Sequence, residues 1–315
     1  MSELTTSRVA HHVAVAAVTL TYVAVTVGES ILAPILPIAS SRLGLDEAAA
    51  GRILGLLSLS AGVGNLVGGA MLGRFGPKIP AMLGAALTSI GAALAAVEAG
   101  SSQFTAAHVL MGLGAGVFFA SGIYSIGFLA DPRRRGRAMG LFGIAYSLAL
   151  ALAAGLVAVM GPDAWRAVFA VAAWLGGAAL VAVAFADLPS RTKVVNGGVG
   201  SGLRLLGIPV AVGGAAAVAQ FGLVAFVTTL AVDDWTMTES SAAVVLLVGR
   251  ILSIPGKAWA GRLADRRGAI GAARVVTITL LASGAACLTV PAVWIGAAAS
   301  AVFAAAAGAM FPVAN

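Results

Sequence analysis

Two short stretches decide how this chain folds: Gly-Arg-Leu-Ala-Asp-Arg-Arg-Gly at 261–268 and Gly-Ala-Met-Leu-Gly-Arg-Phe-Gly-Pro-Lys at 69–78. Each follows a long apolar segment, and their first residues, at positions 69 and 261, are 192 positions apart. The same offset pairs Gly-Val-Phe-Phe-Ala at 116–120 with Gly-Ala-Met-Phe-Pro at 308–312. A repeat of this length between hydrophobic segments predicts a membrane protein made of two related halves.

The composition independently indicates a membrane protein. Hydrophobic residues make up 60% of the chain and charged residues only 10%, with a mean hydropathy of +1.02. The 41 glycines fit close packing between helices in lipid, where small residues let backbones approach. The net charge of +7 lies mainly in the connections between apolar segments, so we do not read it as a nucleic-acid-binding surface. The single cysteine, Cys287, excludes an internal disulfide.

Ten apolar segments are each near the ~20 residues that a membrane-spanning helix needs. Lipid offers no partner for backbone N–H and C=O groups, so each segment is predicted to be an α-helix. We therefore expect an all-α membrane protein with about ten transmembrane helices. The segments cover residues 12–38, 48–73, 79–98, 104–130, 138–160, 165–187, 204–232, 241–261, 271–290 and 292–315.

The connections between these segments alternate in charge. One set contains only Arg42, Arg52 and Arg166 as basic residues, together with most of the remaining acidic ones. Because lysine and arginine concentrate on the cytoplasmic side, the other set and the N-terminus are predicted to be cytoplasmic, in a multi-pass protein of the plasma (inner) membrane. That set carries Arg8, Arg74, Lys78, Arg133, Arg134, Arg135, Arg137, Arg191, Lys193, Arg204, Arg262, Arg266, Arg267 and Arg274.

The pattern of the two opening stretches resembles the signature between the second and third helices of the major facilitator superfamily (MFS) of secondary transporters. In the first copy, Gly73 stands where the family usually has an aspartate. The resemblance implies an MFS fold of two six-helix bundles, with these stretches acting as conformational-switch loops. The residues that match the signature are Gly69, Arg74, Gly76 and Lys78 in the first copy and Gly261, Asp265, Arg266 and Gly268 in the second.

A glycine-rich stretch at 194–202 has the composition of a flexible linker and follows the sixth predicted helix. We therefore expect a six-helix bundle at 1–190, a cytoplasmic linker at 191–203 and a second bundle at 204–315. The fourth helix ends near 130, so the 192-residue offset would end the tenth near 322, whereas the chain ends at Asn315. We accordingly expect part of a twelve-helix protein, whose second bundle is incomplete here and contains helices seven to ten.

Ionisable residues inside predicted spans are costly and are therefore functional candidates. Glu29 lies within the first span, and Tyr22, seven residues earlier, can share its helix face. Arg250 lies in the middle of the eighth span, with Lys257 seven residues later on the same face. Glu29 is predicted to carry a proton. Two cations on one face suggest either an anionic substrate or a counter-ion to Glu29, in which case Arg250 would pair with it.

Uncharged polar residues inside the spans are weaker candidates. Asn65 and Gln220 can hydrogen-bond a substrate or simply hold helices together. His108 stands where many members of the superfamily carry an arginine, and a histidine in a membrane can relay protons. No nucleophile–base pair, metal-ligand cluster or nucleotide-binding motif occurs, so we expect neither an enzyme nor a bound cofactor or metal.

The predicted function is secondary active transport of a small solute by alternating access, coupled to protons, with an organic or inorganic anion as substrate. Two alternatives stay open. One is multidrug or metabolite efflux by proton antiport, although 143–155 lacks the Gly-Pro pattern frequent in such antiporters. The other is a non-transporting remnant. The expected partners are the small-molecule substrate, protons and the lipid bilayer, without nucleic acid, and the protein is expected to be a monomer.

The orientation can be tested by labelling single cysteines from one side of the membrane. Cysteines at Arg134 and Arg266 should react only with reagents on the cytoplasmic side, and those at Asp163 and Asp234 only from outside, because basic residues stay in the cytoplasm. Labelling at Asp234 restricted to the cytoplasmic side would contradict the assignment.

Overall fold

The structure is a computed structural model of the 315-residue chain. It describes residues 2–97, 100–130, 135–188 and 226–289, together with 298, 299 and 302. These residues form helices, turns and short connections, and none of them lies in a β-strand. The expected all-α class is therefore confirmed for the described part of the chain.

The chain groups into two compact units, which we call unit 1 and unit 2. Unit 1 comprises residues 1–31, 43–149 and 164–194, and unit 2 comprises 32–42, 150–163 and 195–315. The helices of unit 1 are α1 (Ser2–Ser30), α3 (Glu47–Phe75), α4 (Lys78–Ala96), α5 (Ser101–Leu129), the N-terminal part of α6 (Arg135–Met160) and α7 (Trp165–Phe185). Unit 2 contains α2 (Leu32–Leu43), the C-terminal part of α6, η2 (Pro162–Ala164), α9 (Val227–Asp233) and α10 (Glu239–Thr289).

Six helices in the described residues are long and apolar enough to cross a membrane. They correspond to the first six predicted spans and differ at their ends by a few residues. The first of them joins α1 and α2 through a turn at Ile31. The six are His11–Leu43, Glu47–Phe75, Lys78–Ala96, Ser101–Leu129, Phe142–Met160 and Pro162–Phe185.

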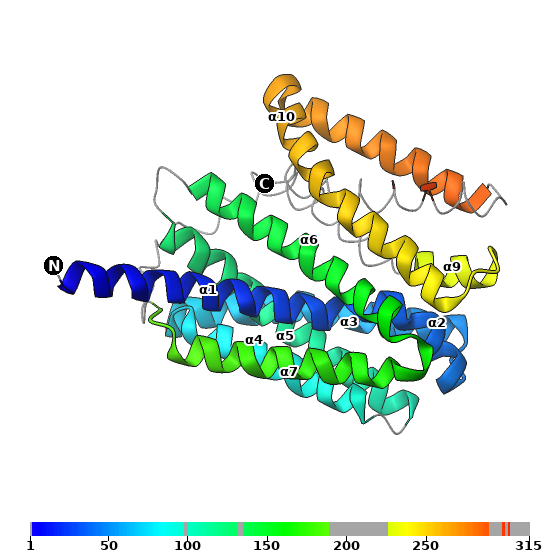
Figure 1. The fold of residues 1–315 in the computed structure, drawn as a ribbon, viewed down its shortest axis with the longest axis horizontal. Coiled ribbons are helices and arrows are strands. Elements are labelled where there is room, and N and C mark those ends of the chain that lie inside the picture. The colour runs from blue at the N-terminus through cyan, green and yellow to red at the C-terminus, as the bar shows by residue number, and fades with distance from the viewer. Residues whose placement is uncertain are drawn as a thin grey trace. The chain divides into compact units, whose positions relative to one another are not determined.

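The remaining four predicted spans are only partly described. The segment 204–232 is described from residue 226 onward, where α9 begins one residue later, and nearly all of 292–315 lies outside the described residues. The segments 241–261 and 271–290 lie in one helical run, α10. Figure 1 shows a bend between the two arms of α10. The number of ten transmembrane helices therefore stays a prediction.

The stretch 261–268, expected as a connection between two spans, has a helical backbone within α10, and its predicted role as a switch loop stays a prediction. The first copy of the signature differs, because it contains a turn. There Gly76 has a φ of +75° and is followed by Pro77, and α3 ends. In the second copy Ala269 follows Gly268, so no proline interrupts a sequence rich in leucine, alanine and arginine, which favour helix.

Unit 1 is held together by helices that pack side by side, with α5 in contact with α1, α3 and α4, and α7 against α1 and α4 (Figure 1). The closest approach is between α3 and α5. A Cβ atom at Gly112 would overlap the carbonyl oxygen of Leu57, and one at Gly116 would overlap that of Ala61. Only glycine permits this separation, as expected for helices that associate in lipid.

The turn between α3 and α4 contains the first copy of the signature and contacts a distant helix end in unit 1. Gly76 donates its backbone N–H to the carbonyl of Leu72 at 3.0 Å, which ends α3. Two residues later, Lys78 Nζ donates to the carbonyl of Ala186 at 3.1 Å. Ala186 is the C-cap of α7, where carbonyls lack helical donors and a cation is favoured. The signature thus fixes the end of α7, shortly before the predicted linker.

This contact can be tested with Lys78→Met, which keeps the aliphatic chain and removes the charge. Losing a cation at a helix C-terminus should destabilise that end by about 0.3–1 kcal/mol. Backbone amide hydrogen exchange should therefore become faster around 182–188, as measured by mass spectrometry. Arg74→Met is the matched control, because Arg74 is exposed and its guanidinium lies over the ring of Phe75, 5.3 Å from the centroid. Equal exchange in wild type and Lys78→Met would contradict the capping role.

Candidate functional site

Glu29 lies in the penultimate position of α1 and is buried, with 4% of its surface exposed. Among the residues that the structure describes, none makes a hydrogen bond or ion pair with its carboxylate. The neighbouring Gly28 explains the burial in part, because α1 approaches α4 closely there, against Thr88. A carboxyl group without a fixed counter-ion can gain or lose a proton without breaking an ion pair, so the burial of Glu29 fits its predicted role.

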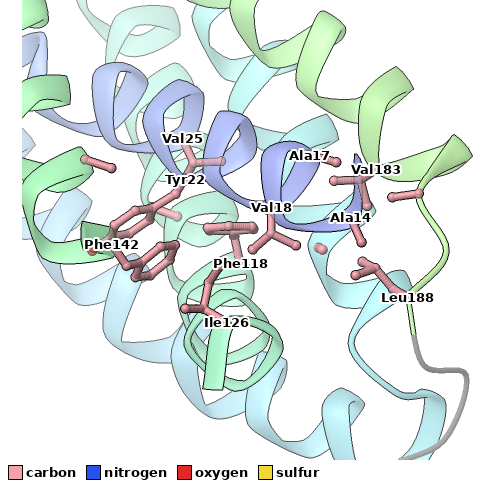
Figure 2. Close-up of a cluster of buried hydrophobic side chains, with 14 residues drawn as sticks. Ala14, Ala17, Val18, Tyr22, Val25, Phe118, Ile126, Phe142, Val183 and Leu188 are labelled. Carbon is pink, nitrogen blue, oxygen red and sulfur yellow. The ribbon is translucent and has the colours of Figure 1, made fainter. Parts of the chain in front are cut away.

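Tyr22 lies two turns before Glu29 on α1 and is also 4% exposed. Its ring stacks on Phe142 of α6, with centroids 3.7 Å apart and an interplanar angle of 8° (Figure 2). Phe118 and Phe119 of α5 and Tyr146 of α6 surround the same ring. Glu29 lies seven residues after Tyr22 on the same helix and is likewise buried. The structure therefore brings the predicted residues Tyr22 and Glu29 into one region of unit 1.

The aromatic neighbours of Tyr22 were missed by sequence reasoning. Phe142 and Tyr146 are four residues apart and therefore share one face of α6, which is a signal that the sequence carries. Phe118 and Phe119 lie in the stretch used above only as evidence for the repeat. What the sequence lacked was the knowledge that α1, α5 and α6 present these faces to one another.

Of the site residues predicted in unit 2, Arg250 is the one whose side chain the structure describes. It lies in α10 and is 4% exposed, which fits a functional residue in a membrane span. Lys257 has its backbone in α10, but its side chain lies outside those described, and Gln220 lies outside the described residues altogether. The predicted pairing of Glu29 with Arg250 joins residues of different units and stays a prediction.

The two uncharged candidates of unit 1 have contrasting environments. Asn65 has an exposed side chain on α3. His108 of α5 is fully buried, and its Nδ1 lies 2.7 Å from the carbonyl of Phe104, one turn earlier. Its ring packs against Phe104 and Phe169, and its Nε2 has no hydrogen-bond partner among the described residues. The substrate-binding role of Asn65 therefore stays a prediction.

The signature residues also separate into two groups. In the first copy, Gly69 and Arg74 are exposed, Gly76 makes the turn and Lys78 caps α7. In the second copy, Arg266 is exposed on α10. Gly261, Asp265 and Gly268 have helical backbones in α10, and their side chains lie outside those described, so their predicted role in a conformational switch stays a prediction.

A proline in α2 creates a polar contact within unit 2. Pro37 has no N–H, so the carbonyl of Ala33, four residues earlier, lacks its usual helical donor. The hydroxyl of Thr228 in α9 donates to that carbonyl at 2.6 Å. At the far end of α2, Arg42 Nη2 forms an exposed ion pair with Asp163 Oδ1 at 2.9 Å. Unit 2 therefore joins α2, from the predicted first half, to α9, from the predicted second half.

The comparisons with known proteins agree with this architecture. The D-xylose-proton symporter structure has a TM-score of 0.72 at 16% identity and covers 96% of this chain and 80% of that chain. An inward-facing, unoccupied bacterial homologue of the human lysosomal transporter Spinster also has a TM-score of 0.72 at 16% identity, covering 97% of this chain and 74% of its own. At these identities the likeness shows the fold alone.

Two curated relatives match part of the chain. The probable L-galactonate transporter of Escherichia coli K12 is 30% identical over 139 residues, 43% of this chain and 30% of that protein. The methylenomycin A resistance protein of Bacillus subtilis 168 is 31% identical over 138 residues, 42% of this chain and 29% of that protein. Each match thus spans under a third of the relative's length. The sequence profile of the Major Facilitator Superfamily matches residues 18–315, and this chain therefore belongs to that superfamily of multi-pass membrane transporters.

Proposed function

We propose that this protein is a proton-coupled secondary transporter of a small organic solute, with Glu29 as the proton carrier. The observation that carries the proposal is the burial of this carboxyl group in α1 without an ion-pair partner among the described residues. An acidic residue in a membrane span is expensive to keep unless it has a function. The resemblance in fold to a structure described as a proton symporter supports the same reading.

Alternating access requires contacts that close one end of the protein and later break. The hydrogen bond from Thr228 to Ala33 has the properties of such a contact. It joins segments of the two predicted halves within unit 2, on the helix α2, whose C-terminal end carries the ion pair of Arg42 with Asp163 on the predicted outer side. A single hydrogen bond contributes about 0.5–1.5 kcal/mol, small enough to be exchanged during transport. We propose that this contact helps to close the outer end.

The predicted anionic substrate depends on Arg250 and Lys257. The burial of Arg250 in α10 is compatible with a ligand for an anion, and the match to a probable L-galactonate transporter points to the same substrate class. Efflux by proton antiport is the second candidate, favoured by the match to a methylenomycin A resistance protein. We retain for the whole protein the proposed bundles at 1–190 and 204–315, the linker between them, the cytoplasmic N-terminus, the plasma membrane location and the monomeric state.

The proton-carrier role can be tested with Glu29→Gln in proteoliposomes. A panel of radiolabelled sugars, sugar acids and organic cations first identifies a solute that the wild-type protein accumulates when a pH gradient is imposed. In Glu29→Gln, accumulation driven by the gradient should fall to the level of protein-free liposomes, because an amide cannot exchange a proton. Exchange of the solute between the two sides without a gradient should persist.

Glu47→Gln is the matched control, because Glu47 is exposed at the start of α3 and should leave the coupling unchanged. Gradient-driven accumulation equal to wild type in Glu29→Gln would remove the proton-carrier role. Absence of gradient-driven accumulation in the wild-type protein for every solute would instead favour the non-transporting alternative.

The outer contact can be tested from both of its sides. Thr228→Val removes the donor, and Pro37→Ala supplies an N–H that can satisfy the carbonyl of Ala33 within α2. Each should open the outer end, so a cysteine at Ser30, next to Glu29, should react faster with a membrane-impermeant thiol reagent added outside. This measurement uses a background in which Cys287 is replaced by serine.

Because both substitutions act on one hydrogen bond, the double variant should react no faster than the faster single variant. Thr105→Val is the control, since that exposed hydroxyl bonds to the carbonyl of Ser101 in its own helix. Additive effects of the two substitutions, or an equal effect of Thr105→Val, would contradict a shared outer contact.

A further inference from the structure

A groove in unit 2 lies between the ninth and tenth predicted spans, and it has a volume of about 520 Å³. One wall belongs to the second arm of α10, drawn in orange in Figure 1. The other wall belongs to the tenth span, 292–315. A groove of this volume can hold a small molecule or a hydrocarbon chain. Its lining includes Ile278, Thr279, Ala282 and Ser283 of α10 and Ala299 and Val302 of the tenth span.

The groove is apolar although it contains two hydroxyl groups. Thr279 donates its hydroxyl hydrogen to the carbonyl of Val275 at 3.0 Å, and Ser283 donates to the carbonyl of Thr279 at 2.7 Å. Both donors are therefore used within α10, and the other lining residues are aliphatic. A polar solute would lose hydrogen bonds with water here and find no free hydroxyl donor among the lining residues, which costs free energy. The lining thus favours a hydrocarbon.

The repeat explains how the groove arises. The 192-residue offset relates the groove to the surface of α4 and α5 in unit 1. There the larger side chains Leu87, Ile90 and Leu110 stand at the positions of Thr279, Ala282 and Val302. The isoleucine of the groove, Ile278, is larger than its counterpart Ala86, but it is 66% exposed and lies at the edge. The second half therefore has less side-chain volume between its two helices.

A second difference between the halves separates the two helices of unit 2. Gly91 of α4 lies at the position of Ser283, and a Cβ atom there would lie only 2.7 Å from the carbonyl oxygen of Ala107 in α5. A serine does not permit so close an approach. The wider separation and the smaller side chains together leave the groove.

The corresponding surface of unit 1 is not covered by a helix. Although α7 packs against α4, Ile90 is 52% exposed and Ala106 of α5 is exposed. In unit 2, Ile278 and Val302 are exposed as well. Exposed aliphatic side chains in the middle of membrane-spanning segments are in contact with lipid. The groove therefore opens toward the bilayer.

Arginines lie on α10 at the predicted cytoplasmic end of the groove. Arg267, Gly271, Arg274 and Ile278 follow at spacings of four, three and four residues and so form one stripe of the helix. Both arginines are exposed, and among the described residues neither forms an ion pair. The sequence contains no aspartate or glutamate from 266 to 315. The charge beside the groove is therefore exclusively positive.

The groove and the arginines are separated by a distance that suits a lipid. Ala282 is eight residues from Arg274, about 12 Å along the helix axis. One leaflet accounts for half of the hydrocarbon core, about 15 Å. An arginine near a helix end extends its guanidinium toward the headgroups. A lipid with its chain in the groove would therefore have its headgroup at the level of the arginines.

We propose that the groove binds one acyl chain of an anionic phospholipid whose phosphate group contacts Arg274 and Arg267. Basic residues on the cytoplasmic side attract anionic lipids, and basic pockets between transmembrane helices bind their headgroups. The chain fills the space that the small side chains leave and so restores dispersion contacts between spans nine and ten. The lipid is a bound partner and not the transported solute, so this site is independent of Glu29 and of proton coupling.

The headgroup contact can be tested by native mass spectrometry of the purified full chain in detergent. The probes are dioleoyl phosphatidylglycerol, which is anionic, and dioleoyl phosphatidylcholine, which has the same chains and no net charge. The wild-type protein should bind phosphatidylglycerol about fivefold more tightly or better. Arg274→Gln should weaken that binding about fivefold, as expected for one arginine beside an anionic headgroup, and leave phosphatidylcholine unaffected. Arg52→Gln is the matched control, because Arg52 is exposed on α3.

The groove is tested by the double variant Thr279→Leu/Ala282→Ile, which introduces the side chains that unit 1 carries at Leu87 and Ile90. Filling the groove should weaken binding of phosphatidylglycerol several-fold. Ala106→Ile is the matched control, because it adds an isoleucine to the exposed surface of α5 and leaves the groove unchanged. Size-exclusion profiles should show that all variants are folded, and the Arg274→Gln measurement stands if the double variant is not.

The proposal fails on any of the following results. Equal affinity of the wild-type protein for the two lipids would remove the headgroup contact. Phosphatidylglycerol binding that is unchanged in the folded double variant would show that the groove does not hold the chain. Dimers of the wild-type protein that are absent from the double variant would assign the groove to a contact between two copies of this chain.

Discussion

The constraint on which this structure depends is that backbone polar groups inside a membrane must be satisfied within the protein. In lipid an unpaired N–H or C=O has no water to bond to, so each spanning segment is a helix. Hydroxyl groups follow the same rule, and several of them bond to carbonyls of their own helix. Thr21 bonds to Ala17, Ser58 to Leu54 and Ser125 to Ser121. Where a helix end or a proline leaves a carbonyl without a donor, another part of the chain supplies one.

Two such carbonyls define the contacts that matter for the proposed function. The end of α7 receives Lys78, from the signature turn between α3 and α4. The carbonyl of Ala33, released by Pro37, receives Thr228 of α9. Both donors come from residues more than 100 positions away in sequence. The first holds a helix end within unit 1, and the second joins α2 and α9 within unit 2. Each of these hydrogen bonds is strong enough to favour one conformation and weak enough to break when the conformation changes.

Close packing provides the frame for the site. Glycine at 112 and 116 lets α5 approach α3 until backbones touch. The same helix brings Phe118 and Phe119 to Tyr22. The carboxyl group of Glu29, seven residues after Tyr22 on α1, is buried, and no lysine or arginine described in unit 1 is buried. This arrangement suits the proposed proton-carrier role, because a carboxylate already bound to an arginine would have to lose that partner before it could take a proton.

The sequence by itself determined that this is a helical membrane protein, where its first six spans lie and that Glu29 and Arg250 are buried, because hydrophobic length and the cost of intramembrane charge are local properties. It did not show that the backbone of 261–268 is helical within α10, because the glycines and charges of this stretch resemble those of the turn at 69–78. Nor could it show that Lys78 reaches Ala186, that Thr228 reaches Ala33, or that five aromatic rings meet around Tyr22. Those contacts join residues far apart in the chain, and only tertiary packing decides which helix faces meet.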